Sequence, residues 1–278
     1  MYFKRKIDDA LIQWKNDPSH KPLIVKGARQ IGKTESVLHF AKANYSNVIY
    51  INFVLNKKYS TIVSDGYDVN TVTKNITLAN PSIKFIPGKT VIIFDEIQEY
   101  PDVATTLKAF NQDGRYDVIC SGSMLGINYQ KIHSNSVGNK TDYEMFSMDF
   151  EEFLWAKGYY DEQIKDILNH MVDLKPFSET ELRVYKSLFL DFCVLGGMPD
   201  VIRGYIEEGT FSNSIERQNQ IRLDYEEDVR KYAKGLDQAK IINVYRSIPA
   251  QLAKENKKFQ IIYNCSSLVQ LLKIVINQ

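Results

Sequence analysis

The chain has 278 residues, 44% of them apolar and 12% aromatic, which is enough for one large or two modest globular domains. Its formal net charge of +1 gives no global attraction for nucleic acid, so such binding would need a local patch. Three widely spaced cysteines exclude a disulfide framework and an ordinary zinc site. There is no membrane-span-length apolar run and no signal-peptide pattern, so we expect a cytoplasmic protein without a membrane partner.

The first predicted elements are a helix and a strand. Apolar residues at helical spacing from Ile7 to Trp14 predict a short amphipathic helix, which Pro18 ends. The apolar run at residues 22–26 predicts a buried strand, and residues 35–43 again repeat apolar side chains at helical spacing. The segment between this strand and this helix therefore connects the two directly.

That connecting segment, GARQIGKT at residues 27–34, fits the phosphate-loop pattern G-x-x-x-x-G-K-[ST] at every specified position. Backbone N–H groups must turn inward around a phosphate chain, and Gly27 and Gly32 supply the necessary freedom. Lys33 is expected to reach the β- and γ-phosphates, and the Thr34 hydroxyl to be one ligand of Mg²⁺. The following helix directs its positive end at the anion.

A second motif closes a later strand. Residues 47–53 predict a strand, and residues 69–76 carry a weaker helical pattern. The segment TVIIFDEIQ at residues 90–98 then predicts a strand buried on both faces, with two carboxylates at its carboxyl end, where an open α/β sheet binds its ligand. Asp95 is predicted to hold the Mg²⁺, and Glu96 to orient and deprotonate the attacking water.

The next strand ends in serines. Pro101 is predicted to start a short helix that Gly114 ends, and residues 116–123 predict a strand. Ser121 or Ser123 is a candidate for a polar contact near the γ-phosphate. Serine at a strand end is also a common turn former, so both interpretations stand.

The rest of the chain reads mostly as helix. Residues 142–150 predict a fifth strand, and a helical region begins after it. The later predicted elements are helices at residues 161–172 and 179–193, a turn at 196–199, and two long helices within 212–256.

Taken together, these segments resemble bacterial and archaeal AAA-type P-loop ATPases that carry a C-terminal domain of unknown function. The residues that carry the resemblance are KPLIVKGARQIGKT, VIIFDEIQEYP, CSGS, MDFEEFLWAKG, GGMP and SIPAQLAKENKKF, within residues 1 to 259. The resemblance implies an ATP-binding core with five parallel strands and a helical lid. It also implies a C-terminal region that contains a winged-helix-like part and, in some relatives, a nuclease-like part.

The expected fold is therefore α/β: a P-loop NTPase sheet of five parallel strands flanked by helices, followed by a mostly helical region. We expect an ATPase core at residues 1–155, a helical lid at 156–208 and a partial C-terminal domain at 209–278. The expected cofactors are ATP and Mg²⁺, with Thr34 and Asp95 on the metal and with Lys33 and Glu96 as catalytic residues. The residues expected to contact the nucleotide are Gly27, Ala28, Arg29, Gln30, Ile31, Gly32, Lys33, Thr34, Glu35, Ser121 and Ser123.

Two departures from the family pattern stand out. Members commonly carry P-V-G-[RK] before the fifth strand, whereas this chain has SVGNK, with Asn139 at the basic position. Lys140 is then the basic residue that would take over as a γ-phosphate sensor. The resemblance also fades after Phe259, and residues 260–278 form an apolar tail, from which a truncated C-terminal domain is expected.

Two functions are compatible with these motifs. The first is a Mg²⁺-dependent ATPase in which hydrolysis moves the helical region against the core. The second is a nucleotide-gated switch or scaffold with little turnover that binds DNA or a protein partner. A GTPase is less consistent, because neither NKKY nor NKKF has the Asp of NKxD. A homo-oligomer could supply an arginine in trans, and the candidates are Arg29, Arg115, Arg203, Arg222 and Arg246.

Overall fold

The structure is a computed structural model that describes residues 1–123, 136, 138–232 and 236–253. Two compact units divide the chain, Met1–Gly209 and Thr210–Gln278. The predicted border between core and lid at residue 155 lies inside the first unit and stays a prediction, and the predicted apolar tail lies outside the described residues.

A five-stranded parallel sheet forms the centre of the first unit, in the order β2-β3-β4-β1-β5. This confirms the predicted α/β fold. The strands are β1 (Leu23–Gly27), β2 (Asn47–Asn52), β3 (Thr90–Asp95), β4 (Asp117–Ser123) and β5 (Thr141–Glu144).

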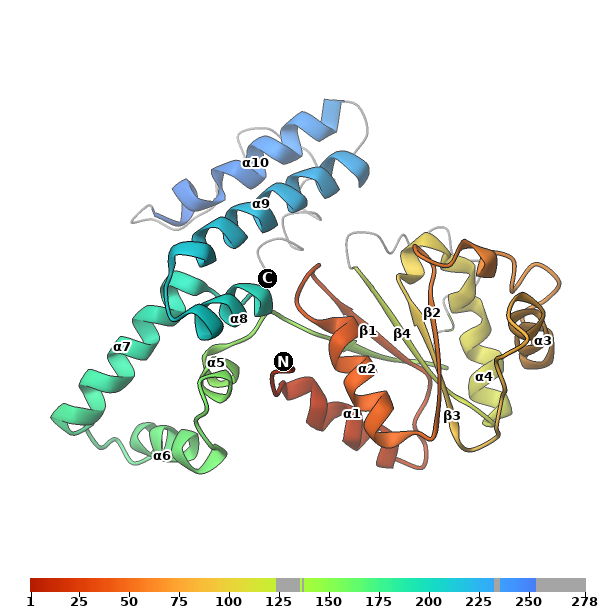
Figure 1. Cartoon of the computed structure of the whole chain (residues 1–278), viewed down its shortest axis with the longest axis horizontal. Helices are drawn as coiled ribbons and strands as arrows, with labels where there is room; N and C mark the ends of the chain where they lie inside the picture. The colour runs from red at the N-terminus through yellow and green to blue at the C-terminus, as the bar shows by residue number, and fades with distance from the viewer. Residues whose placement is uncertain (124–135, 137, 233–235, 254–278) are drawn as a thin grey trace. The chain divides into compact units, whose positions relative to one another are not determined.

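Helices cover both faces of this sheet (Figure 1), with α1 and α2 on one face and α3 and α4 on the other. Their bounds are α1 (Lys6–Asn16), α2 (Lys33–Asn44), α3 (Val69–Ala79) and α4 (Leu107–Asp113). Short 3-10 helices lie in the connections: η1 (Lys57–Tyr59), η2 (Ile97–Glu99) and η3 (Pro101–Thr106). Gly114, with φ +68°, ends α4 as predicted.

The side chains of the central strand β3 explain why helices must cover both faces of the sheet. Val91 and Ile93 pack into the cluster that α1 and α2 complete, whereas Ile92 and Phe94 pack into the cluster beneath α3 and α4. Successive side chains of a strand point to opposite faces, so this apolar run must be buried on both. Truncating a buried aromatic such as Phe94 to alanine typically costs about 3–5 kcal/mol.

The fifth strand is shorter than predicted. It ends at Glu144, and residues 145–149 form an irregular connection before a helix begins at Phe150. The Asp149 side chain accepts a hydrogen bond from the backbone N–H of Glu152, a capping contact that starts the helix inside the predicted strand.

Four helices complete the first unit: α5 (Phe150–Ala156), α6 (Asp161–Val172), α7 (Glu179–Leu195) and α8 (Pro199–Glu208). The sequence patterns predicted only a turn where α8 begins. Pro199 occupies its first position and Gly209, with φ +70°, ends it, which are the preferred residues for those places. Gly197 is required by packing, because a Cβ there would lie 2.1 Å from the Met148 carbonyl oxygen.

The described part of the second unit consists of α9 (Ser212–Tyr232) and α10 (Leu236–Leu252). The Glu226 carboxylate on α9 is buried and accepts hydrogen bonds from Arg222 at 2.8 Å and from Arg246 of α10 at 2.6 Å. This ion pair joins the two helices. The winged-helix-like part stays a prediction. Among the described helices, none combines the length and the apolar character needed to cross a membrane.

Candidate functional site

The predicted phosphate loop connects β1 to α2. Gly27 lies against the segment after β5, where a Cβ would come within 2.2 Å of the Met145 carbonyl oxygen, so no other residue fits. Gln30 and Gly32 have φ values of 63° and 93°, in the left-handed region. Gly32 is the N-cap of α2, so the loop delivers the positive end of a twelve-residue helix to the space it encloses.

Lys33 folds back over this loop. Its Nζ donates hydrogen bonds to the carbonyl of Gly27, at 3.1 Å, and to that of Ala28. Burial lowers the pKa of the Lys33 ammonium to about 8, while the nearby carboxylates of Glu96 and Asp95 act in the opposite direction. A phosphate entering the loop would therefore meet a partly buried cation that donates hydrogen bonds to two neutral carbonyls.

Asp95 is the centre of a buried polar cluster at the carboxyl ends of three neighbouring strands. The register of the sheet aligns it with Asn52 on β2 and Ser121 on β4. Its carboxylate accepts hydrogen bonds from Asn52 Nδ2 at 3.0 Å, from Tyr50 at 2.7 Å, and from the Ser121 hydroxyl. Burial raises the pKa of the Tyr50 hydroxyl to about 12, with the bond to Asp95 as the second cause, so Tyr50 stays a donor at neutral pH.

The loop and the Asp95 cluster share one site. The Thr34 hydroxyl lies 3.2 and 3.1 Å from the two carboxylate oxygens of Asp95. A hydroxyl and a carboxylate at this spacing, beside a partly buried lysine, suit a hard cation that carries a phosphate. The buried Ser123 hydroxyl, aligned with Gly27 across the sheet, makes no hydrogen bond to any described residue, so a donor is left over at this edge. The residues present therefore fit a magnesium-bound nucleotide.

Glu96 follows Asp95 in the left-handed region, with φ 57°. That conformation costs a non-glycine residue about 1–3 kcal/mol and is typical of functional sites. Gln98 Nε2 donates a hydrogen bond to the Glu96 carboxylate, and the side-chain oxygen Gln98 Oε1 accepts one from the Ser123 N–H at 3.2 Å. Gln98 therefore holds the Glu96 carboxylate relative to the end of β4.

Most of the predicted site residues lie together, but two are engaged elsewhere. The Glu35 carboxylate, in the first turn of α2, accepts hydrogen bonds from Arg203 of α8 at 3.2 and 3.4 Å. The Ile31 carbonyl accepts a hydrogen bond from Arg5 at 2.7 Å, on the outer side of the loop. The side chain of Arg29 lies close enough to Lys33 to lower its pKa.

The expectation that Lys140 senses a γ-phosphate is wrong within this chain. β5 runs parallel to β1, with Leu23 opposite Thr141, so Lys140 lies at the amino end of the strand, whereas the loop follows the carboxyl end of β1. Its Nζ donates to both carboxylate oxygens of Asp142, at 2.7 and 2.6 Å. The sheet register, which the motif spacing does not give, decides this point.

Sequence reasoning missed several residues of the site. Asn52 and Tyr50 left a usable signal, since two polar side chains on one face of a predicted strand end close to where the ligand binds. Gln98 left a weaker one, as a polar residue directly after the acidic pair. Arg5, which directly precedes α1, left none. Arg203 was a candidate only for an arginine supplied in trans, whereas the structure pairs it with Glu35 of its own chain.

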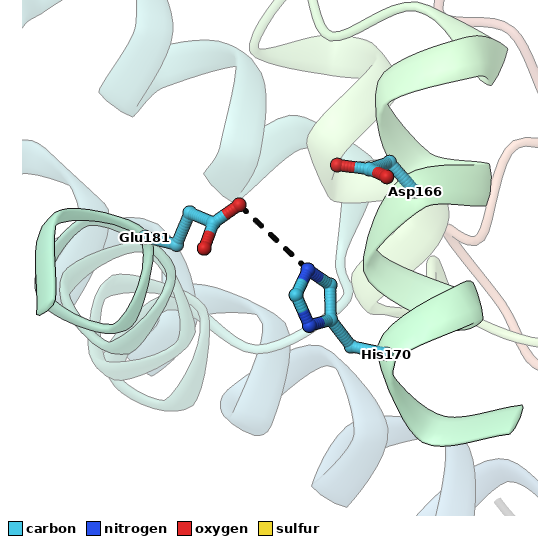
Figure 2. Close-up of side chains that lie close together, drawn as sticks. All are labelled: Asp166, His170 and Glu181. Carbon is cyan, nitrogen blue, oxygen red and sulfur yellow. Dashed lines mark ion pairs between the residues drawn. The ribbon is translucent and has the colours of Figure 1, made fainter. Parts of the chain in front are cut away.

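A second group of possible metal ligands lies between α6 and α7 (Figure 2). Ligand atoms of Asp166, His170 and Glu181 all lie within 4.8 Å of one another. His170 Nε2 pairs with Glu181 at 3.7 Å, and its Nδ1 contacts the Lys175 carbonyl at 3.2 Å. These contacts join the end of α6 to the start of α7 and account for the arrangement without an ion.

Solved structures with a similar fold include a Walker-type ATPase of Pyrococcus abyssi, which is 14% identical, with a TM-score of 0.56 over 99% of this chain and 89% of the other. The RuvB Holliday junction branch migration motor of Thermotoga maritima is 13% identical, with a TM-score of 0.36 over 54% of this chain and 48% of the other. The Orc1 protein of Aeropyrum pernix, in complex with DNA, is 12% identical, with a TM-score of 0.35 over 98% of this chain and 81% of the other. None of the curated proteins matches the chain.

Two family models match the sequence. One describes an AAA domain and covers residues 19–154; the other describes a domain of unknown function (DUF8612) and covers residues 186–267, running past the Phe259 at which the motif resemblance fades. Together with the shared fold, they confirm the resemblance inferred from the motifs. The chain therefore carries a P-loop AAA domain, matched over residues 19–154, followed by a region that matches a domain of unknown function.

Proposed function

We propose that the protein is a Mg²⁺-dependent ATPase that couples nucleotide hydrolysis to movement of its helical C-terminal region. The observation that supports this most directly is the contact between Thr34 and Asp95, at 3.1 and 3.2 Å, beside the partly buried Lys33. It joins the phosphate loop to the acidic strand end, as a shared site for a metal ion and a triphosphate requires.

In this proposal each side chain has one role. Lys33 exchanges its two carbonyl contacts for phosphate oxygens, which satisfy its charge better. Thr34 and Asp95 hold the Mg²⁺, which when bound neutralises charge on the phosphates. Glu96 orients the attacking water and accepts its proton, and Gln98 keeps the Glu96 carboxylate in place.

The link to movement is proposed through α8. Arg203 on that helix pairs with Glu35, which directly follows the metal-binding Thr34 in the sequence. A change in the first turn of α2 on nucleotide binding would therefore act on α8 through this ion pair. Because the pair is partly exposed, its strength should fall with salt.

A nucleotide-gated switch with little turnover is the second candidate. The observation that favours it is the position of Lys140, at the amino end of β5 and away from the phosphate loop. The SVGNK segment therefore places no basic side chain of this chain at the phosphates. Such a switch would bind DNA or a protein partner through the C-terminal region. In an ATPase, a second copy of the chain would have to supply the missing arginine.

Binding and turnover measured together test the proposal. The parent chain should bind a fluorescent ATP analogue with Mg²⁺ at micromolar concentration, and Lys33→Ala should abolish that binding. Equal binding by parent and Lys33→Ala would contradict any nucleotide function at this loop. Binding with near-zero turnover at every protein concentration would favour the switch.

A cytoplasmic location is part of the proposal, in keeping with the free thiols of Cys120 and Cys193.

A further inference from the structure

A buried charge lies on the outer side of the phosphate loop. The Arg5 side chain is 4% exposed and that of Glu152 is 5% exposed, and Arg5 Nε lies 3.0 Å from Glu152 Oε1 in an ion pair that lacks hydrogen-bond geometry. The other two guanidinium nitrogens donate to backbone carbonyls, one to Ile31 at 2.7 Å and one to Phe146 at 2.8 Å. Arg5 therefore contacts the loop, the segment after β5, and α5 at once.

The contact with Ile31 acts on a single peptide group. A trans peptide is planar, so the carbonyl of Ile31 and the N–H of Gly32 point in opposite directions. Arg5 holds that carbonyl on its own side, so the Gly32 N–H points away from Arg5, as expected of an N–H that is turned inward to a phosphate. Inward N–H groups of this kind are what a phosphate loop offers its anion.

We infer that Arg5 is a positioning residue that holds the Ile31–Gly32 peptide in the orientation needed for phosphate binding and connects it to α5 through Glu152. The inference rests on the proposed nucleotide function. It adds a residue that lies outside the loop and that would act without touching the nucleotide.

Glu152 is well placed as the anchor of this contact. Its carboxylate accepts hydrogen bonds from the N–H of Lys6, the first residue of α1, at 2.7 Å, and from the N–H of Asp149 at 3.2 Å. The backbone at the starts of α1 and α5 therefore holds the Glu152 carboxylate in place independently of its contact with Arg5. A buried ion pair adds little net stability compared with an apolar pair, because desolvation offsets the attraction. Its contribution here is the orientation of the guanidinium.

The same peptide also faces α8. A Cβ on Gly32 would lie 3.5 Å from the guanidinium of Arg5 and 3.8 Å from the ring of Pro199, at the first position of α8. Arg203, one turn further along, pairs with Glu35. A shift of the loop on phosphate binding would thus be passed to α5 through Arg5, and a shift of the first turn of α2 to α8 through the Glu35–Arg203 pair.

The test removes the ion pair without leaving a buried charge. Arg5→Met combined with Glu152→Gln deletes both charges and keeps an acceptor for the N–H of Lys6. Arg5→Lys retains one charge and one hydrogen bond as the conservative variant. Asn47→Ala is the matched control, because it removes hydrogen bonds to Lys84 and Thr90 at the opposite end of the sheet.

Two measurements are made on the full chain below its melting temperature. Affinity for a fluorescent ATP analogue, and its displacement by pyrophosphate, should weaken at least about tenfold in the double variant, less in Arg5→Lys, and not in Asn47→Ala. Without nucleotide, amide exchange in residues 27–35 should be faster in the double variant than in the parent and in Asn47→Ala.

The outcomes separate the two claims. Parent-like affinity and parent-like exchange in the folded double variant would overturn the role of Arg5. If the parent binds nucleotide no better than Lys33→Ala, the proposed function fails, and the exchange measurement alone then decides whether Arg5 orders the loop. Equal loss in Asn47→Ala and in the double variant would show a general destabilisation and would also overturn the inference.

Discussion

Lys33 is a partly buried cation whose charge depends on pH. Burial brings its pKa to about 8 in the free protein, and a bound phosphate raises it again by favouring the charged form. The bound state therefore holds more protons than the free state above that pH. Nucleotide affinity should then be constant below pH 8 and fall as pH rises further.

We expect the dissociation constant of a fluorescent ATP analogue to rise about tenfold per pH unit above pH 8, as one proton is taken up on binding. Titrations between pH 7 and 9.5 measure this, since the phosphates are already ionised there. Lys33→Met should bind weakly with no such dependence. An affinity that increases with pH would contradict the assignment.

Glu96 is predicted to act on water rather than on the bound nucleotide. Glu96→Gln should keep nucleotide affinity and lower turnover by about 10²- to 10⁴-fold, the usual contribution of a general base. Glu99→Gln, which changes an exposed acid in the same segment, is the control and should turn over like the parent. Parent-like hydrolysis by the Glu96 variant would show that another group activates the water.

Asp95 shows how far single side chains can be foreseen. Asp95 itself can be predicted from the sequence, because the buried apolar strand that places it lies directly before it in the chain. Its partners Tyr50 and Ser121 come from two other strands and depend on the register of the sheet. Their contact with Asp95 could be inferred only once β2, β3 and β4 were known to be neighbours.

Among the elements, the glycine-rich turn before α8 has a structural role that the sequence pattern did not reveal. Gly197 packs against Met148, whose N–H donates a hydrogen bond to the Gly197 carbonyl at 2.7 Å. This contact joins the segment that follows β5 to the start of α8. It is made by backbone on both sides, so neither partner can move aside easily.

Gly197→Ala should therefore destabilise the first unit more than Gly114→Ala does. Gly114 has φ +68° and open space around it, so alanine there costs only the left-handed conformation, about 1–2 kcal/mol. Thermal melting of both variants makes the comparison. A melting temperature for Gly197→Ala equal to or above that of Gly114→Ala would show that the segment adjusts without strain.

The elements that sequence patterns predicted well are those with strong local signals. Strands β1 and β3 are apolar runs, and α6 has clear helical spacing. The errors lie before α5, where the strand ends at Glu144 and Asp149 caps a helix at the end of the predicted strand, and at α8, which is short and follows a turn. The Gly197–Met148 contact, which joins the segment before α5 to the turn before α8, links residues distant in sequence that a local pattern does not reveal.

For the whole molecule, the proposed ATPase predicts a dependence on concentration. A second copy that supplies an arginine would raise turnover by roughly 10³- to 10⁵-fold when the copies associate. Specific activity should then increase with protein concentration, measured alongside the assembly state by light scattering. Constant specific activity over a range in which the state changes would exclude an arginine in trans and favour a site complete in one chain.

The charged edge of the sheet restricts how such copies can meet. β5 is an outer strand of four residues, and Asp142 on it pairs with both Lys26 and Lys140. Short outer strands bearing charges resist pairing with a strand of another molecule. Self-association by continuing the sheet past β5 is therefore disfavoured, and neighbours meeting on that side would have to dock through side chains instead of through shared backbone hydrogen bonds.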